Sequence, residues 1–225
     1  GGTTNLCHNA VDRHLKDRAN QNALIWVSTE TDQQVCYTYA QLHAEVQRMA
    51  ATLKDLGVGK GDRVLIYMPM IAEACFAMLA CARIGAIHSV VFGGFAAHSL
   101  ATRIDDAKPK LIVSADAGSR VGKVVPYKPL LDEAIRLASH KPAHVLLVDR
   151  HLSAMERVAG RDVDYAELRH QFMDAKVPVT WLQSDHISYI LYIKCLSKFI
   201  PFFIKILCIA YTIVSLNFYY LIFIF

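Results

Sequence analysis

The sequence of 225 residues lacks the spacing patterns of several large classes of protein. Its six cysteines form no CxxC pair and no other metal-ligand spacing, which predicts free thiols in a reducing compartment, either the cytoplasm or the mitochondrial matrix. No GxSxG elbow is present to support a hydrolase, and no GxxxxGK[ST] phosphate loop occurs. The ten histidines do not cluster, so we predict no metal site and assign no catalytic residue.

A strong charge of one sign is also missing. The formal net charge is +4, and no run of Lys and Arg with interleaved aromatic residues occurs, so we expect no nucleic-acid partner. Hydrophobic residues make up 54% of the chain and charged residues 20%. This composition is typical of a globular protein that carries an additional apolar segment.

Glycine and acidic residues are absent from the last part of the chain. All 11 glycines and all 20 acidic residues lie before residue 193. Residues 206–225 are an uncharged run rich in Ile, Leu, Phe and Tyr, long enough to span a bilayer as a helix. We therefore divide the chain into a globular region, 1–192, and a hydrophobic tail, 193–225, with membrane association expected only if the tail is genuine.

The globular region alternates predicted strands and helices. Thr38 and Gln41 have the spacing of a capping box, which predicts a helix that Gly57 ends. Further helices are predicted near 71–83, 99–107, 130–138 and 165–173, and strands at 64–68, 87–92, 111–114, 145–148 and 187–192. Such alternation predicts an α/β fold with a mainly parallel sheet and flanking helices on both faces.

Two glycines directly follow the predicted strand 87–92. Phe92, Gly93 and Gly94 would form a loop at the carboxyl end of a parallel strand, where ligands gather in open α/β sheets. Glycine lets a ligand approach the backbone closely. A plain turn between strand and helix explains the same residues, so both interpretations stay open.

A second candidate loop, 116–123, follows the predicted strand 111–114. It contains Arg120, Val121, Gly122 and Lys123. A guanidinium and an ammonium group beside flexible backbone suit a ligand that bears phosphate. The alternative is charge that only faces solvent.

Several motifs together resemble the adenylate-forming acyl-CoA synthetases. They occur in the order and spacing of that superfamily: YTYAQL at 37–42, GVGKGDRV at 57–64, YMP at 67–69 and RIGAIHSVVFGGF at 83–95. The segments 87–95 and 101–106 are similar to the acetyl-CoA and propionyl-CoA synthetase branch, and NAVDRH at 9–14 is similar to propionate–CoA ligases. The resemblance covers residues 1–192.

The resemblance implies a function and a set of ligands. Such enzymes activate acetate or propionate with ATP and Mg²⁺ to an acyl-adenylate, and the thiol of CoA then displaces AMP. By the same resemblance, 120–123 matches the family's CoA-binding loop, and the turn 92–94 is similar to the element beside the CoA nucleotide. Both loops selected on their chemistry are therefore expected CoA contacts, and small molecules are the expected partners.

The resemblance stops after Tyr192. In the family, a strand at this point leads into the Gly- and hydroxyl-rich loop TSGTTGxPKG, whose backbone N–H groups hold the ATP phosphates. Here the following residues are IKCLSK, without glycine. We therefore expect only part of the CoA site and no synthesis of acyl-CoA by this chain.

Three explanations of the tail remain open. Translation has run into unrelated or intronic sequence, or the chain is a genuine truncated product that aggregates or is degraded, or it is a tail-anchored protein that keeps a CoA- or nucleotide-binding half-domain without catalysis. The direct junction between 187–192 and the apolar run argues against the last explanation. A half-sheet without its remaining strands would also expose apolar edges.

Overall fold

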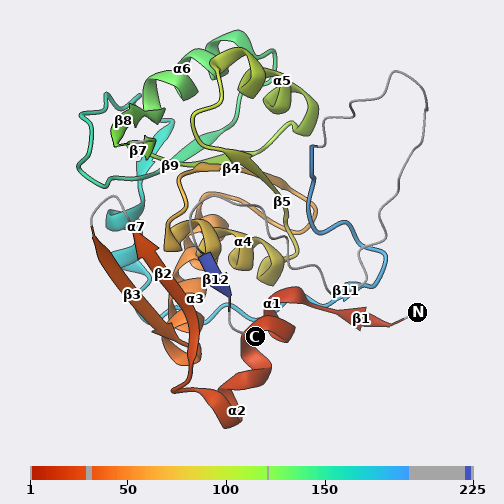
Figure 1. Ribbon diagram of the computed structural model, residues 1–225. Coiled ribbons are helices and arrows are strands. Elements are labelled where there is room, and N and C mark those ends of the chain that lie inside the picture. Colours follow the sequence, from red (N-terminus) through yellow and green to blue (C-terminus); the bar gives the residue numbers. More distant parts are fainter. Residues whose placement is uncertain (1, 29–31, 121, 193–220, 224–225) are drawn as a thin grey trace, which may run out of the picture.

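Five parallel strands form the sheet around which the chain folds (Figure 1). The computed structural model describes residues 2–28, 32–120, 122–192 and 221–223. The strand order is β10-β9-β6-β4-β5, so β4 lies between β5 and β6. The bounds are β4 (Arg63–Met68), β5 (Ile87–Phe92), β6 (Leu111–Ala115), β9 (His144–Val148) and β10 (Asp162–Asp164).

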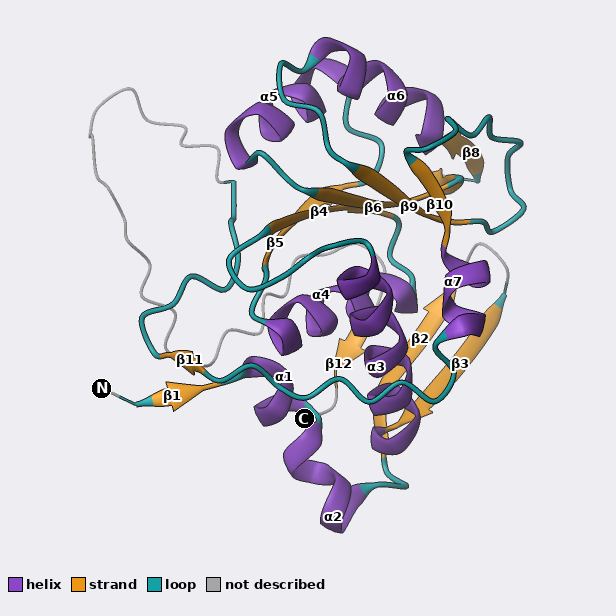
Figure 2. Ribbon diagram, turned by 180° about the vertical axis from the view of Figure 1, so that it is seen from behind, coloured by secondary structure: helices purple, strands orange, loops and turns teal. Residues whose placement is uncertain are grey.

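Helices cover both faces of this sheet (Figure 2). On one face lie α5 (Ala97–Ala107) and α6 (Tyr127–Leu137), and on the other lie α3 (Tyr39–Asp55), α4 (Ala72–Ile84) and α7 (Tyr165–Gln171). Along β4 the side chains alternate between the two hydrophobic clusters, with Leu65 and Tyr67 on the α5–α6 side and Ile66 on the α3–α4 side. A strand buried on both faces is typical of parallel sheets, and the predicted fold class is confirmed.

The helix boundaries follow local sequence signals. The capping box at α3 is confirmed, because the Gln41 N–H donates to Thr38 Oγ1 at 3.2 Å and the Thr38 N–H donates to Gln41 Oε1 at 2.9 Å. Helix α4 ends at Gly85, whose φ of 75° is left-handed and suits glycine. Helices α3 and α4 therefore begin and end where the sequence predicts, within a few residues.

Short elements at the two ends of the described chain complete the fold. The N-terminal segment contains β1 (Thr3–Thr4), α1 (Leu6–Ala10), the 3₁₀-helix η1 (Asp12–His14) and α2 (Leu15–Arg18). Strand β1 pairs antiparallel with β11 (Leu182–Gln183).

A second sheet contains β2 (Asn22–Ser28), β3 (Gln33–Thr38) and β12 (Leu221–Phe223). A separate hairpin contains β7 (Ala117–Arg120) and β8 (Lys123–Pro126).

The predicted strand 187–192 is wrong as a strand. The segment runs parallel to β5 but forms only a single bridge, between His88 and Tyr189. The Ile190 N–H donates to the His88 carbonyl at 2.9 Å, while Ile187 and Leu191 are 61% and 63% exposed. Side chains this exposed add little apolar burial, so no continuous ladder is stabilised here.

The predicted tail, 193–225, lies outside the described residues except for β12. Within the described residues, no helix is long and apolar enough to cross a membrane. The three residues of β12 form a strand that pairs antiparallel with β2.

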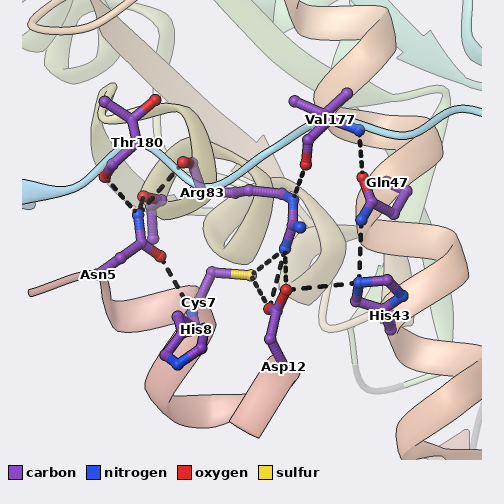
Figure 3. A network of polar contacts seen from close by, with 10 residues as sticks. Asn5, Cys7, His8, Asp12, His43, Gln47, Arg83, Val177 and Thr180 are labelled. Carbon is purple, nitrogen blue, oxygen red and sulfur yellow. Dashed lines mark hydrogen bonds and ion pairs between the residues drawn. The ribbon is translucent and has the colours of Figure 1, made fainter. Parts of the chain in front are cut away.

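A buried ion pair ties the N-terminal segment to α4 (Figure 3). Arg83 Nη1 donates to both carboxylate oxygens of Asp12 at 2.9 Å, and Arg83 Nε donates to the Val177 carbonyl at 2.6 Å. The Arg83 side chain is 4% exposed, and His43 Nε2 lies 3.5 Å from Asp12. Burial opposes the charged form of Asp12, but the hydrogen bond from His43 and the charge of Arg83 outweigh it and lower the pKa of Asp12. Burial raises the pKa of the neighbouring Cys7 thiol to about 12.

Asn5 makes a second set of contacts beside this pair (Figure 3). Its side-chain amide donates to the carbonyls of Ala82 at 2.8 Å and Thr180 at 2.9 Å, and its oxygen accepts from the His8 N–H as the N-cap of α1. Asn5 is fully buried. The N-terminal segment, α4 and the segment that precedes β11 are thus held together by polar groups that have partners.

Candidate functional site

The two predicted binding loops lie at the same edge of the parallel sheet. The turn 92–94 follows β5, and the segment 116–123 follows β6. Because β5, β4 and β6 are parallel neighbours in the order β5-β4-β6, both loops leave the carboxyl ends of their strands at one edge. This is the edge where open α/β sheets bind ligands.

The turn after β5 exposes an aromatic ring beside open backbone. Phe92 is 60% exposed, and its ring packs edge to face against Phe95 with centroids 6.2 Å apart. The guanidinium of Arg103, from α5, lies 4.6 Å from the centre of the Phe95 ring. Gly94 has a φ of 89°, and no atom lies within 4 Å of where a Cβ would be. The Cα side of Gly94 is therefore open to the approach of a ligand.

The segment after β6 is a hairpin rather than an open loop. Arg120 in β7 pairs with Lys123 in β8, and Gly122 at the tip has a left-handed φ of 73°. Val121 lies outside the described residues. Lys123 is exposed, as is the neighbouring Val124 at 50%. The tip thus presents at least one cation to solvent.

Asp116 fixes the base of the hairpin. Its carboxylate is completely buried and accepts three backbone N–H groups, from Leu152 at 2.7 Å, Ser153 at 3.1 Å and Arg150 at 3.2 Å. Its backbone carbonyl accepts the Tyr127 N–H at 2.8 Å. Charge-assisted bonds of this kind are stronger than neutral ones, so the hairpin leaves the sheet in a fixed direction.

Two tyrosines contact the loops, and sequence reasoning missed both. Tyr67, at the end of β4, accepts the Gly94 N–H at 3.2 Å and donates to the Phe95 carbonyl at 3.3 Å. Burial raises the pKa of the Tyr67 phenol, which keeps it a neutral donor. Tyr127, the first residue of α6, lies against both Gly93 and Gly118. The sequence signal was available: Tyr67 is in the YMP motif, and Tyr127 directly follows the candidate loop.

The groups exposed at this edge suit a nucleotide. An exposed ring, an open glycine backbone and the Lys123 ammonium suit the aromatic base and phosphates of a nucleotide. Within the part of the chain that the structure describes, no group of three or more His, Cys, Asp or Glu side chains could hold a metal.

A cavity elsewhere also escaped the sequence analysis. It has a volume of about 220 Å³ and lies between the β2–β3 hairpin and the start of α4, with Trp26, Tyr37, Glu73 and Arg150 among its lining residues. Burial raises the pKa of Glu73, and the charge of Arg150 opposes that rise. No residue of the turn 92–94 or of the hairpin 117–126 lines it, so it is separate from the candidate loops.

Comparison with known proteins identifies the family. The model of the AMP-binding enzymes matches residues 11–192. The chain belongs to the AMP-binding enzyme family. It is 65% identical over 191 residues to a propionate–CoA ligase of Escherichia coli, and 49% identical over 192 residues to an acetyl-coenzyme A synthetase of Methylobacterium radiotolerans. The resemblance found from the motifs is thus confirmed.

The chain spans only part of these relatives. The two alignments cover 85% of this chain but 30% of each relative. A solved structure, the acetoacetyl-CoA synthetase from Streptomyces lividans, matches with a TM-score of 0.75 and 29% identity, over 85% of this chain and 28% of that one. Family membership and fold are therefore shown for the globular region.

Proposed function

We propose that residues 1–192 are the N-terminal portion of a short-chain carboxylate–CoA ligase domain, and that they supply part of its CoA site. The observation that carries this proposal is the meeting of two loops at the carboxyl edge of the sheet. The turn 92–94 supplies an exposed ring and an open Cα, and the hairpin tip supplies Gly122 and the exposed Lys123. The proposed site also includes Arg120 and Val121, on the resemblance of 120–123 to the family's CoA-binding loop. The identity of 65% to a propionate–CoA ligase supports propionate or acetate as the acid that the parent enzyme activates.

In this role the residues of the chain bind and orient but do not catalyse. Lys123 and Arg120 would pair with phosphate oxygens of CoA, and Phe92 would contact its base. ATP and Mg²⁺, which the family uses, would bind through residues that lie beyond the matched 30% of the relatives. We therefore propose that this chain alone forms no acyl-adenylate, because positioning of the reactants supplies much of the rate of such reactions.

Calorimetry on the full chain tests the CoA site. CoA should bind, and dephospho-CoA, which lacks the 3′-phosphate, should bind more weakly. The double variant Arg120→Ala with Lys123→Ala should weaken CoA binding by at least about tenfold, which corresponds to roughly 1.4 kcal/mol. The matched control is Arg13→Ala with Lys16→Ala, which removes two exposed cations from the N-terminal segment. Equal losses in both double variants, or no CoA binding by the parent, would refute the site.

Exchange of pyrophosphate into ATP tests the proposed lack of catalysis. The chain should show background exchange with propionate or acetate present, while a full-length relative measured in parallel should show exchange. Acid-dependent exchange by this chain above background would refute the proposal.

The alternative is a CoA- or nucleotide-binding half-domain that the tail anchors to a membrane. It shares the CoA site and differs only in residues 193–225, so flotation of the full chain with lipid vesicles distinguishes the two proposals. For the parent enzyme we propose the cytoplasm or the mitochondrial matrix. Cys7, Cys75 and Cys81 support a reducing compartment, because all three are buried free thiols.

A further inference from the structure

The two glycines that face Tyr127 have no conformational reason to be glycine. Gly94 and Gly122 have left-handed φ angles, which favour glycine at those positions. Gly93 and Gly118 do not have positive φ angles. A different cause must therefore explain a missing side chain at these two places, one in each candidate loop.

That cause is the ring of Tyr127. A Cβ on Gly93 would lie 2.1 Å from the Tyr127 hydroxyl oxygen, and a Cβ on Gly118 would lie 2.4 Å from the same atom. Both distances are far below van der Waals contact. One phenol edge therefore touches the backbone of the turn after β5 and the backbone of the hairpin after β6.

The ring of Tyr127 is held in place from several directions. Its residue is 6% exposed, and its ring centre lies 5.1 Å from that of Tyr67, which is completely buried. The next residue, Lys128, is 1% exposed and pairs with Asp132 at 2.5 Å and Asp162 at 2.9 Å. These pairs hold the backbone at the start of α6, and the packing on Tyr67 holds the Tyr127 ring above the two loops.

We propose that Tyr127 is a positioning residue that sets the separation of the two CoA-binding loops. It fills the space between Gly93 and Gly118, so that Gly94 of the first loop and Lys123 of the second face one ligand at a fixed spacing. The proposal rests on the proposed function, because it takes CoA as the ligand. Tyr127 itself acts through the loops and does not contact the ligand.

Removal of the whole Tyr127 ring, which we call the spacer, should weaken CoA binding more than removal of its hydroxyl alone. In Tyr127→Phe the nearest ring carbon still lies 2.4 Å from a Cβ built on Gly93, so the spacer remains and CoA affinity should change less than about threefold. Tyr127→Ala should lower the affinity by more than about tenfold. Hydrogen exchange in Tyr127→Ala should speed up in 92–95 and 117–126 and stay unchanged in β4, which a general loss of stability would not produce.

A double-mutant cycle tests the contact without any ligand. Gly93→Ala should lower the unfolding midpoint of the wild-type chain. It should lower the midpoint of the Tyr127→Ala chain by less, because the added methyl then has room. Gly59→Ala is the matched control, since a Cβ there meets nothing closer than 3.8 Å. Gly59→Ala should show no coupling with Tyr127→Ala.

The outcomes separate this inference from the proposed function. Additive midpoints in the Gly93 cycle, or wild-type CoA affinity in Tyr127→Ala, would overturn the role of Tyr127 while leaving the CoA site intact. Failure of the parent chain to bind CoA would refute the proposed function and with it CoA as the ligand. The cycle would still decide whether Tyr127 holds the two loops apart.

Discussion

Removal of the Asp12 carboxylate should strongly destabilise the fold. Asp12→Ala takes away both hydrogen bonds from Arg83 Nη1 and leaves a guanidinium that is 4% exposed without its counter-charge. Breaking a buried pair by removing one partner costs about 3 to 5 kcal/mol. Since Asp12 is 16% exposed, water can enter, and we expect the lower end, about 3 kcal/mol. For a chain of this size the unfolding midpoint should fall by about 6 to 12 °C.

Thermal unfolding followed by circular dichroism measures this effect. The matched control is Glu133→Ala, which also removes a carboxylate that accepts from an arginine, at 2.6 and 2.8 Å from Arg136. Those side chains are 44% and 70% exposed, so the control should leave the midpoint unchanged. Equal midpoints for the two variants would show that burial of the Arg83–Asp12 pair does not determine its contribution.

The pH dependence gives a second test of the same pair. The pKa of Asp12 is lowered on folding from its ordinary value of 3.8, so the folded protein holds fewer protons on this group than the unfolded chain. Its stabilising contribution is therefore present above about pH 4 and is lost as the pH falls through the lower folded value. The difference in stability between the wild type and Asp12→Ala should shrink below pH 4. A difference that stays constant to pH 2 would refute the assignment.

Three further perturbations follow from single positions. Burial lowers the pKa of His88 from 6.5 to about 4. The free energy of unfolding should therefore fall by up to about 3 kcal/mol as the pH drops from 6.5 to 4. In chemical denaturation, His88→Phe should abolish this dependence on pH. Gly85→Ala should lower the free energy of unfolding by about 1 to 2 kcal/mol in the same assay. The φ of 75° disfavours a side chain, and a Cβ would meet a leucine methyl at 3.0 Å. The control Gly59→Ala should lower it by less than about 0.5 kcal/mol. Ile187 and Leu191 are exposed beside the edge strand β5, so we expect the chain to self-associate at this edge. Leu191→Lys should reduce that self-association in sedimentation velocity more than the control Leu137→Lys, and equal reductions would contradict this.

The central sheet could be predicted because its signals are local. Strand 87–92 is an apolar run that Gly85 precedes and two glycines follow, and β5 has those bounds. The helix after Thr38 was predicted from a capping box whose two hydrogen bonds lie within four residues. Such short-range patterns fix element type before any tertiary contact is known.

The parts that sequence reasoning missed depend on distant partners. Arg83 and Asp12 are 71 positions apart, and no periodicity links them. Strands β7 and β8 were predicted as a polar loop because each has only four residues and β7 contains Gly118, Ser119 and Arg120. For 187–192 the error is the reverse, since a strand was predicted and is not formed. The residues have strand propensity, but the segment has only one bridge to its neighbour.

The candidate site was predicted as two loops but not as one unit. Phe92, Gly93 and Gly94 were chosen for their position after a strand, and 120–123 for charge beside glycine. That both rest on one tyrosine could not be read from the spacing, because the contact arises from the place of α6 over the sheet. Whether these residues bind CoA stays a prediction.

The pairing of β1 with β11 closes residues 3–183 into a loop of chain. Thr3 lies opposite Gln183, and Asn5 reaches the Thr180 carbonyl, so the first residues of the described chain are neighbours of a segment about 180 positions away. Because the two strands share backbone hydrogen bonds, the N-terminal segment and residues 180–183 should open together in local unfolding and not separately.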